Sequence, residues 1–100
     1  MQVTIWEFRA RTGREDEFER AYGPRGEWAG LFQRGEGFLG TELLREVGSA
    51  GRYVTLDRWV SRGAFESFQR RYGDDYKALD ARLEALTEHE AHLGWFEVSQ

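Results

Sequence analysis

The stretch RYVTLDRWVSRGAFESF, residues 52–68, contains the change of period that decides the fold. Its first half is rich in β-branched and aromatic residues, which is typical of a strand running to about residue 60. Ser61 stands where a helix N-cap is expected, and apolar residues follow it at helical spacing. Asp57 and Trp59 lie two apart at the end of the strand. They form either the rim of a small-molecule pocket or only the seam between a strand and a helix.

The flanking sequence predicts a single α+β domain over residues 1–100. Turn signals separate segments of alternating and helical periodicity, giving the order β-α-β-β-α-β. That order is the ferredoxin-like arrangement, a four-stranded antiparallel sheet with both helices on one face. The strands are expected at 2–10, 38–47, 52–60 and 95–99, and the helical segments at 14–34, interrupted at 23–24, and 62–90, interrupted at 73–75.

Both faces of the predicted sheet carry large apolar residues, although the helices cover only one of them. Strand alternation assigns one row to the helix side and the other to the opposite side. A row this apolar is not expected to face water, so the pattern predicts a homodimer in which two sheets cover each other. The helix-side row is Trp6, Phe8, Thr41, Leu43, Tyr53, Thr55, Asp57, Trp59 and Phe96, and the opposite row is Val3, Ile5, Glu7, Phe38, Glu42, Leu44, Val54, Leu56, Arg58 and Val60.

Composition excludes several classes of protein. The net charge is −4 and no basic stripe occurs, so nucleic acid is not an expected partner. Because the chain contains no cysteine, disulfides and Cys-based metal sites are absent, which fits a cytoplasmic location. No apolar segment reaches about 18 residues and the N-terminus lacks a signal-peptide pattern, so no membrane association is expected.

Several of these segments resemble the antibiotic biosynthesis monooxygenase family, whose members form dimeric α+β barrels. The resemblance is carried by GFLGTELLRE at 37–46, YVTLDRW at 53–59 with the following SRGAF, and LGWFEV at 93–98. The family includes cofactor-independent oxygenases acting on aromatic polyketides or quinols, haem-degrading enzymes and many small proteins without an assigned role. The resemblance implies a pocket in each protomer between the sheet and the helices, and no cofactor.

The haem-degrading branch of this family can be compared residue by residue. Its members resemble one another in an Asn on the first strand, a Trp early in the second helix and an iron-ligating His further along it. Here Phe8 stands at the Asn position and Phe68 at the Trp position, and residues 76–80 contain no His. All three positions depart from the pattern, which predicts that haem is not a substrate.

Three residues are candidates for catalysis: Asp57, Tyr72 and His92. Asp57 belongs to the buried row and needs donors or a wetted cavity. Tyr72 can point its hydroxyl into a cavity or serve as a core or dimer contact. His92 is expected with His89 at a helix C-terminus, where the pair either meets the helix dipole or offers two metal ligands. With no further His or Cys to complete a set, no metal site is predicted, and His92 can act as a general base.

The pocket, if present, is expected to be apolar with a few orienting polar groups. Trp28 and Phe32 share a helical face and are either core residues or one wall of such a pocket. Trp59 is expected to pack against Phe68 near Tyr72. The full predicted set of substrate-binding residues is Trp6, Trp28, Phe32, Thr41, Asp57, Trp59, Phe68 and Tyr72.

Two functions are compatible with this pattern. The first is a cofactor-independent monooxygenase, in which a deprotonated, electron-rich aromatic or quinol-type substrate reacts with dioxygen. The second is a non-catalytic domain on the same dimeric scaffold that binds a small molecule or mediates an interaction. Fold analogy cannot choose between them, because function resides in the site.

Overall fold

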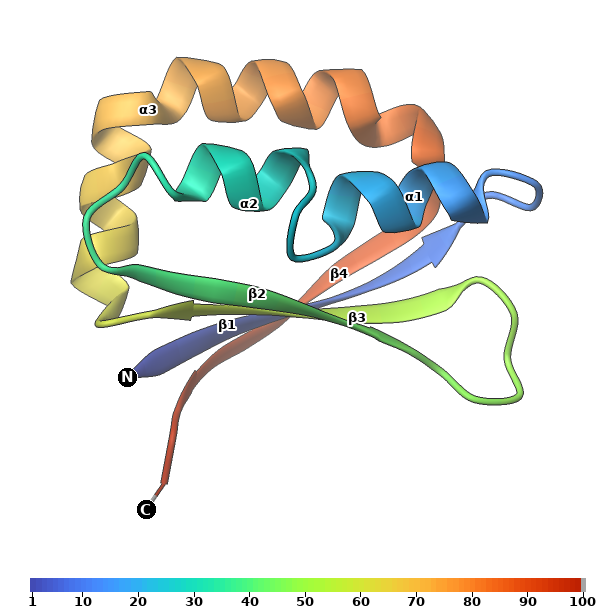
Figure 1. Ribbon diagram of the computed structural model, residues 1–100, viewed down its shortest axis with the longest axis horizontal. Helices are drawn as coiled ribbons and strands as arrows, with labels where there is room; N and C mark the ends of the chain where they lie inside the picture. Colours follow the sequence, from blue (N-terminus) through green and yellow to red (C-terminus); the bar gives the residue numbers. More distant parts are fainter. Residues whose placement is uncertain (100) are drawn as a thin grey trace.

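The computed structural model describes residues 1–99 and forms two layers, a twisted sheet and the helices above it (Figure 1). The sheet is antiparallel with the spatial order β2-β3-β1-β4, which is the ferredoxin-like order predicted from the sequence. The strands are β1 (Gln2–Ala10), β2 (Phe38–Arg45), β3 (Arg52–Trp59) and β4 (Thr87–Glu97). The helices are α1 (Glu15–Tyr22), α2 (Glu27–Phe32), α3 (Arg62–Leu83) and a 3-10 turn, η1 (Glu84–Leu86).

The helices begin and end where local chemistry predicts. The helical segment after β1 is divided at Gly23-Pro24 into α1 and α2, because proline cannot continue the first helix. The Ser61 side chain accepts a hydrogen bond from the Ala64 backbone N–H at 3.1 Å, which confirms it as the N-cap of α3. The expected interruption of α3 appears as a kink at Tyr72.

The end of α3 differs from the prediction. We expected a helix to residue 90 and a short strand over 95–99, but α3 ends at Leu83 and β4 already begins at Thr87. The reason is tertiary: β1 needs a hydrogen-bonded neighbour on its second edge, and residues 87–97 supply it along the whole strand. Pairing in the sheet therefore outweighs the local preference for helix.

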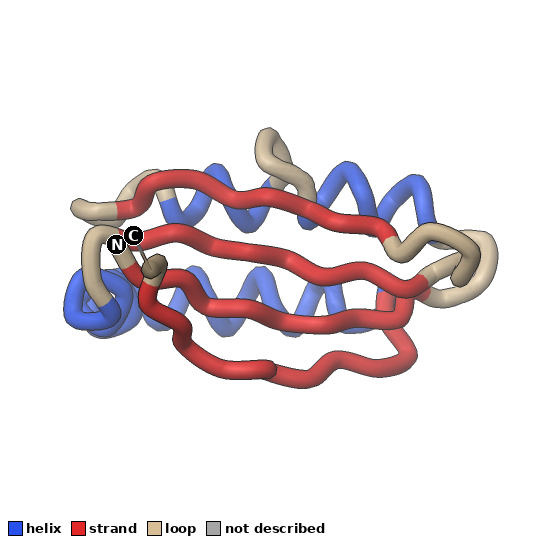
Figure 2. Tube along the Cα trace, turned by 90° about the horizontal axis from the view of Figure 1, so that it is seen from below, coloured by secondary structure: helices blue, strands red, loops and turns tan. Residues whose placement is uncertain are grey.

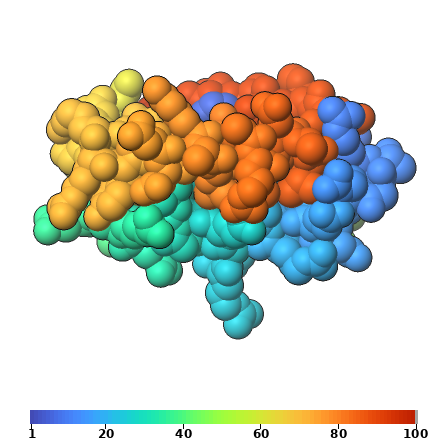
Figure 3. Space-filling view, turned by 90° about the horizontal axis from the view of Figure 1, so that it is seen from above, coloured from blue at the N-terminus to red at the C-terminus, as the bar shows by residue number. Residues whose placement is uncertain are grey.

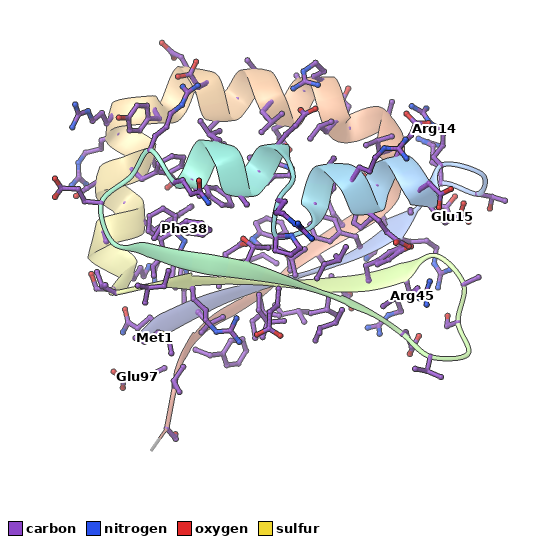
Figure 4. All side chains as sticks on the ribbon, in the orientation of Figure 1. Met1, Arg14, Glu15, Phe38, Arg45 and Glu97 are labelled. Carbon is purple, nitrogen blue, oxygen red and sulfur yellow. The ribbon has the colours of Figure 1, made fainter. Side chains whose placement is uncertain are left out.

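Three register shifts change the strand alternation. Leu39 is skipped in the β2–β3 register, and Leu93 and Glu88 are skipped between β4 and β1. Phe38 consequently lies on the helix side, where its ring centroid is 5.1 Å from that of Trp59 (Figure 4), instead of in the opposite row. Phe96, predicted on the helix side, pairs with Val3 on the opposite side and is half exposed.

The core fills the space between the sheet and the helices and is mainly aromatic. Trp59 and Phe18 are fully buried, and Tyr53 and Phe68 nearly so. The ring centroids of Trp59 and Phe68 are 5.5 Å apart, which confirms the predicted contact between β3 and α3. The aromatic layer holds α3 above the sheet and leaves space at only part of the interface.

Candidate active site

A cavity of about 90 Å³ lies between the helix side of the sheet and the helices. This volume is several times what one water molecule needs. Most of its wall is aromatic, and its floor is formed by polar side chains from β1 and β3. The lining residues are Thr4, Trp6, Phe8, Tyr22, Trp28, Phe32, Thr55, Asp57, Phe65, Tyr76, Asp80 and Glu90.

A groove of about 220 Å³ adjoins the cavity between α3 and β4. Four residues, Thr4, Trp6, Phe65 and Tyr76, line both spaces. The space-filling view from the helix side shows atoms of β1 (dark blue) between α3 (orange) and β4 (red), at the position of this opening (Figure 3). Asp80 on α3 and Glu90 on β4 are exposed members of the cavity lining, so they belong to its mouth.

Asp57 is the buried acid of the cavity, with only 7% of its surface exposed. Its Oδ1 accepts a hydrogen bond from the Thr41 hydroxyl at 2.6 Å. Its Oδ2 has no hydrogen-bond partner in residues 1–99 and is not a fully enclosed atom, so it faces the cavity. Burial raises the pKa of the Asp57 carboxyl to about 6, and the Thr41 hydrogen bond opposes part of that rise. A carboxyl with such a pKa can accept and return a proton near neutral pH.

The strand register explains why Asp57 sits among hydroxyl groups. Asp57 on β3 pairs with Thr41 on β2 and with Thr4 on β1, and all three are buried on the helix side. Thr55, two residues earlier on β3, is buried on the same side. The alternation predicted from the sequence thus places Asp57 and Trp59 correctly, and the floor of the cavity is a short polar row within an apolar sheet face.

Two tyrosines and a tryptophan form the wall opposite this floor. Burial, with a smaller contribution from the nearby carboxylates, raises the pKa of Tyr22 and of Tyr76 to about 12. The ring of Trp28 is 5.1 Å from that of Tyr76. The Trp28 indole N–H lowers the pKa of Tyr22, yet among residues 1–99 it makes no hydrogen bond of acceptable geometry. It is therefore a buried donor without a satisfied partner.

His92 lies at the groove and not at a helix end as we predicted. It belongs to β4, where its Nε2 is 2.8 Å from the Thr4 Oγ1 and its ring centroid is 4.7 Å from that of Trp6. His89 points to the other side of the sheet, with its Nε2 3.7 Å from a Glu7 carboxylate oxygen. The two imidazoles therefore cannot share a metal ion. Within residues 1–99, no three His, Asp or Glu side chains gather in an arrangement that could hold one.

The structure brings together only part of the predicted substrate-binding set. Trp6, Trp28, Phe32 and Asp57 line the cavity. Thr41 lies outside the lining and donates a hydrogen bond to Asp57. The other three members lie outside the lining. Trp59 and Phe68 are enclosed in the core, and Tyr72 packs on Phe68 with a centroid distance of 5.6 Å, beneath the guanidinium of Arg71.

The cavity also contains groups that the sequence did not single out, above all Asp80 and Glu90. Tyr76 and Asp80 are four residues apart and so share a face of α3, a spacing that could have indicated a second acidic wall. No comparable signal existed for Glu90, because residues 84–90 were predicted to be helical. Its position depends on the strand pairing of β4 with β1, in which Glu90 faces Phe8.

The fold and the cavity together define a small ferredoxin-like domain with a buried carboxylate in an aromatic chamber. The model of the antibiotic biosynthesis monooxygenase family matches residues 1–82. The chain therefore belongs to that family. No curated protein matches it, and among residues 1–99 no helix has the length and apolar character needed to cross a bilayer.

Solved structures include relatives with different activities. SnoaB from Streptomyces nogalater, a cofactor-independent oxygenase, is 25% identical, with a TM-score of 0.72 over 99% of this chain and 93% of its own. The haem-degrader MhuD from Mycobacterium tuberculosis, with two haems bound in its active site, is 26% identical, with a TM-score of 0.71 over 100% and 97%. PA3566 from Pseudomonas aeruginosa is 17% identical and shares the fold, with a TM-score of 0.68 over 99% and 94%.

Proposed function

We propose that this protein is a cofactor-independent monooxygenase that oxidises a small phenol or quinol-type molecule bound in the aromatic cavity. The observation that carries this proposal is the Asp57 carboxylate, which is buried, held by Thr41 and open to the cavity through Oδ2. Membership of the monooxygenase family and the similarity to SnoaB support it. A protein that only binds its ligand would have no need of a buried proton acceptor at the floor of the cavity.

The proposed reaction begins with proton transfer from the substrate hydroxyl to Asp57. The phenolate that forms is electron-rich enough to give one electron to dioxygen, and the resulting radical pair combines to form a carbon–oxygen bond. The hydrogen on the bound carbon then passes as a proton to the outer peroxide oxygen while the oxygen–oxygen bond breaks, so that hydroxide departs and a quinone carbonyl remains. The departing hydroxide takes the proton held by Asp57 and becomes water.

This sequence of steps balances without an external reductant. A phenol and dioxygen give a quinone and water, and the four electrons that reduce the two oxygen atoms all come from the substrate. The protein is required to orient the ring, to exclude bulk water and to manage one proton. Trp28 and Phe32 supply a flat apolar wall, and Asp57 is the group for the proton.

Oxygen consumption with a panel of hydroquinones and hydroxylated aromatic ketones tests the proposal, with ¹⁸O₂ used to show that one labelled atom enters the product. We expect Asp57→Asn to reduce turnover by roughly 10²-fold or more, because it removes the base and keeps the shape. Asp74→Asn, the same change on α3 outside the cavity lining, is the control. Unchanged turnover in Asp57→Asn, or no oxygen consumption with any panel member, would overturn the proposal.

A further inference from the structure

Every lining residue of the cavity that carries a charge is acidic. Asp57 lies at the floor, and Asp80 and Glu90 lie at the mouth on α3 and β4. The lining contains no Lys, Arg or His. Within residues 1–99, neither Asp80 nor Glu90 forms an ion pair with a basic side chain.

The electrostatic effects of these three carboxylates overlap in the cavity. Burial raises the pKa of Glu90, and Asp80 and Glu84 raise it further, while His89 opposes them. At Tyr76, Asp80, Asp57 and Glu90 all add to the rise that burial causes in its pKa. The cavity therefore has a negative potential that comes from three side chains on three different elements.

The adjoining groove does not compensate this potential. Its one arginine, Arg62, lies 3.5 Å from the Glu66 carboxylate and places its guanidinium over the Trp95 ring. Its charge is already balanced by Glu66. His92 is the remaining basic group of the groove, and its Nε2 is engaged with Thr4.

We propose that the cavity selects a phenol that carries a protonated amine, with the amine between Asp80 and Glu90 and the phenolic oxygen at Asp57. This inference rests on the function proposed above and specifies its substrate class. The Oδ2 of Asp57 is an open acceptor at the buried end, and the two unpaired carboxylates are acceptors for a cation at the exposed end. An anionic aromatic compound would meet three like charges.

A positive charge on the substrate would also favour ionisation of its phenol. The carboxylates that contribute to the raised pKa values of Tyr22 and Tyr76 would also oppose ionisation of a substrate phenol in the same cavity. A positive charge on the substrate cancels this opposition when the substrate binds. Asp80 and Glu90 are specificity-determining residues in this scheme, since they contact the amine and not the reacting carbon.

Three phenols test the charge selectivity: 4-(2-aminoethyl)phenol, 4-ethylphenol and 3-(4-hydroxyphenyl)propionate. Each has a two-carbon arm on the ring, which carries an ammonium group, no further group or a carboxylate. Their dissociation constants are measured by titration of the wild type, Asp80→Asn, Glu90→Gln and the double variant at pH 7.5 and low salt. Asp74→Asn is the matched control on the same helix. We expect the amine to bind tightest and the carboxylate weakest in the wild type.

Each mouth substitution should weaken binding of the amine roughly five-fold, as expected for a partly solvated charge pair. It should strengthen binding of the carboxylate and leave binding of 4-ethylphenol unchanged. Equal binding of amine and carboxylate to the wild type, no binding of the amine, or a preference that persists in the double variant would overturn the inference. The neutral probe separates the two proposals. If 4-ethylphenol binds and charge has no effect, only the selectivity fails, whereas a cavity that binds none of the probes contradicts the proposed function as well.

Discussion

Asp57 is the buried residue that the proposed reaction uses as its base. A carboxylate buried among Trp, Phe and Thr side chains is costly, because the interior solvates its charge poorly. One hydrogen bond from Thr41 offsets part of this cost, and the second oxygen finds no partner in the part of the chain that the structure describes. The strand alternation around Asp57 was sufficient to predict this burial, but not the open Oδ2.

The free energy of unfolding should therefore depend on pH through Asp57. Burial raises the pKa of its carboxyl from the ordinary 3.8 to about 6 in the folded protein, so between these values the folded chain holds a proton that the unfolded chain has lost. Stability from this group is fully present below pH 3.8 and falls as pH rises through about 6, by up to about 3 kcal/mol. Urea unfolding of the wild type and Asp57→Asn between pH 4 and 8 measures the difference between their profiles.

Thr41→Val provides the second arm of this experiment. Removing the hydroxyl removes the one hydrogen bond that favours the charged form, so the pKa of Asp57 should rise and the pH window should move upward. Asp57→Asn should flatten the profile over the same window. If the wild type and Asp57→Asn have parallel profiles from pH 4 to 7, Asp57 does not titrate as the structure implies.

At the scale of elements, the sequence predicted which segments pair and pack more accurately than how their side chains alternate. The switch of period at Ser61 was enough to define β3 and α3, because both the cap and the apolar spacing are local. The positions of Phe38 and Phe96 were wrong. The bulge at Leu39 separates Phe38 from the correctly placed Thr41, and the face of Phe96 depends on its pairing with Val3, which is distant in sequence. Gly40 and Gly94, both at positive φ, adjoin bulges in the sheet.

The prediction for the end of α3 was wrong for a different reason. Residues 84–90 have a composition compatible with helix, and nothing local opposes it. Their true state depends on an unpaired edge of β1 that is distant in sequence. The residues of the candidate site differ in the same way. Asp57 could be predicted within its own strand, whereas Glu90 required the tertiary pairing.

Gly37 is an element-scale position that is sensitive to substitution, and it joins the helical layer to β2. Its φ is +90°, and a Cβ there would lie 2.6 Å from a Val60 methyl group and 3.0 Å from the Ala64 Cβ. Its carbonyl accepts the Val60 N–H at 2.8 Å. We expect Gly37→Ala to lower the free energy of unfolding by about 1–3 kcal/mol.

Gly30→Ala is the matched control for this prediction. Gly30 lies within α2, has ordinary helical backbone angles, and has open space at the position of a Cβ. Alanine there should raise stability by up to about 1 kcal/mol, since it favours the helix. Chemical denaturation of both variants measures the two changes, and effects of the same sign would contradict the assignment of strain to Gly37.

At the scale of the whole molecule, the main feature is the uncovered side of the sheet. Figure 2 views it directly, with the strands in front and the helices behind. Leu44 and Phe96 are 47% and 48% exposed on this side. Ion pairs lie among such apolar side chains, and one of them joins Arg58 to Glu42 across the β2–β3 hairpin at 2.5 Å. A surface of this composition is typical of an interface.

We expect two copies of the chain to associate through this face, so that sedimentation equilibrium at micromolar concentration gives a mass near twice 11.7 kDa. Leu56 lies on β3 within the uncovered face, and Leu56→Arg would bury an unpaired charge there, weakening association by several kcal/mol. Val47→Arg, on a loop residue that is 99% exposed, should not change the mass. A wild-type mass of one chain would contradict the prediction. An equal loss of association in both variants would place the contact away from the sheet, because only Leu56 belongs to the face that the helices leave uncovered.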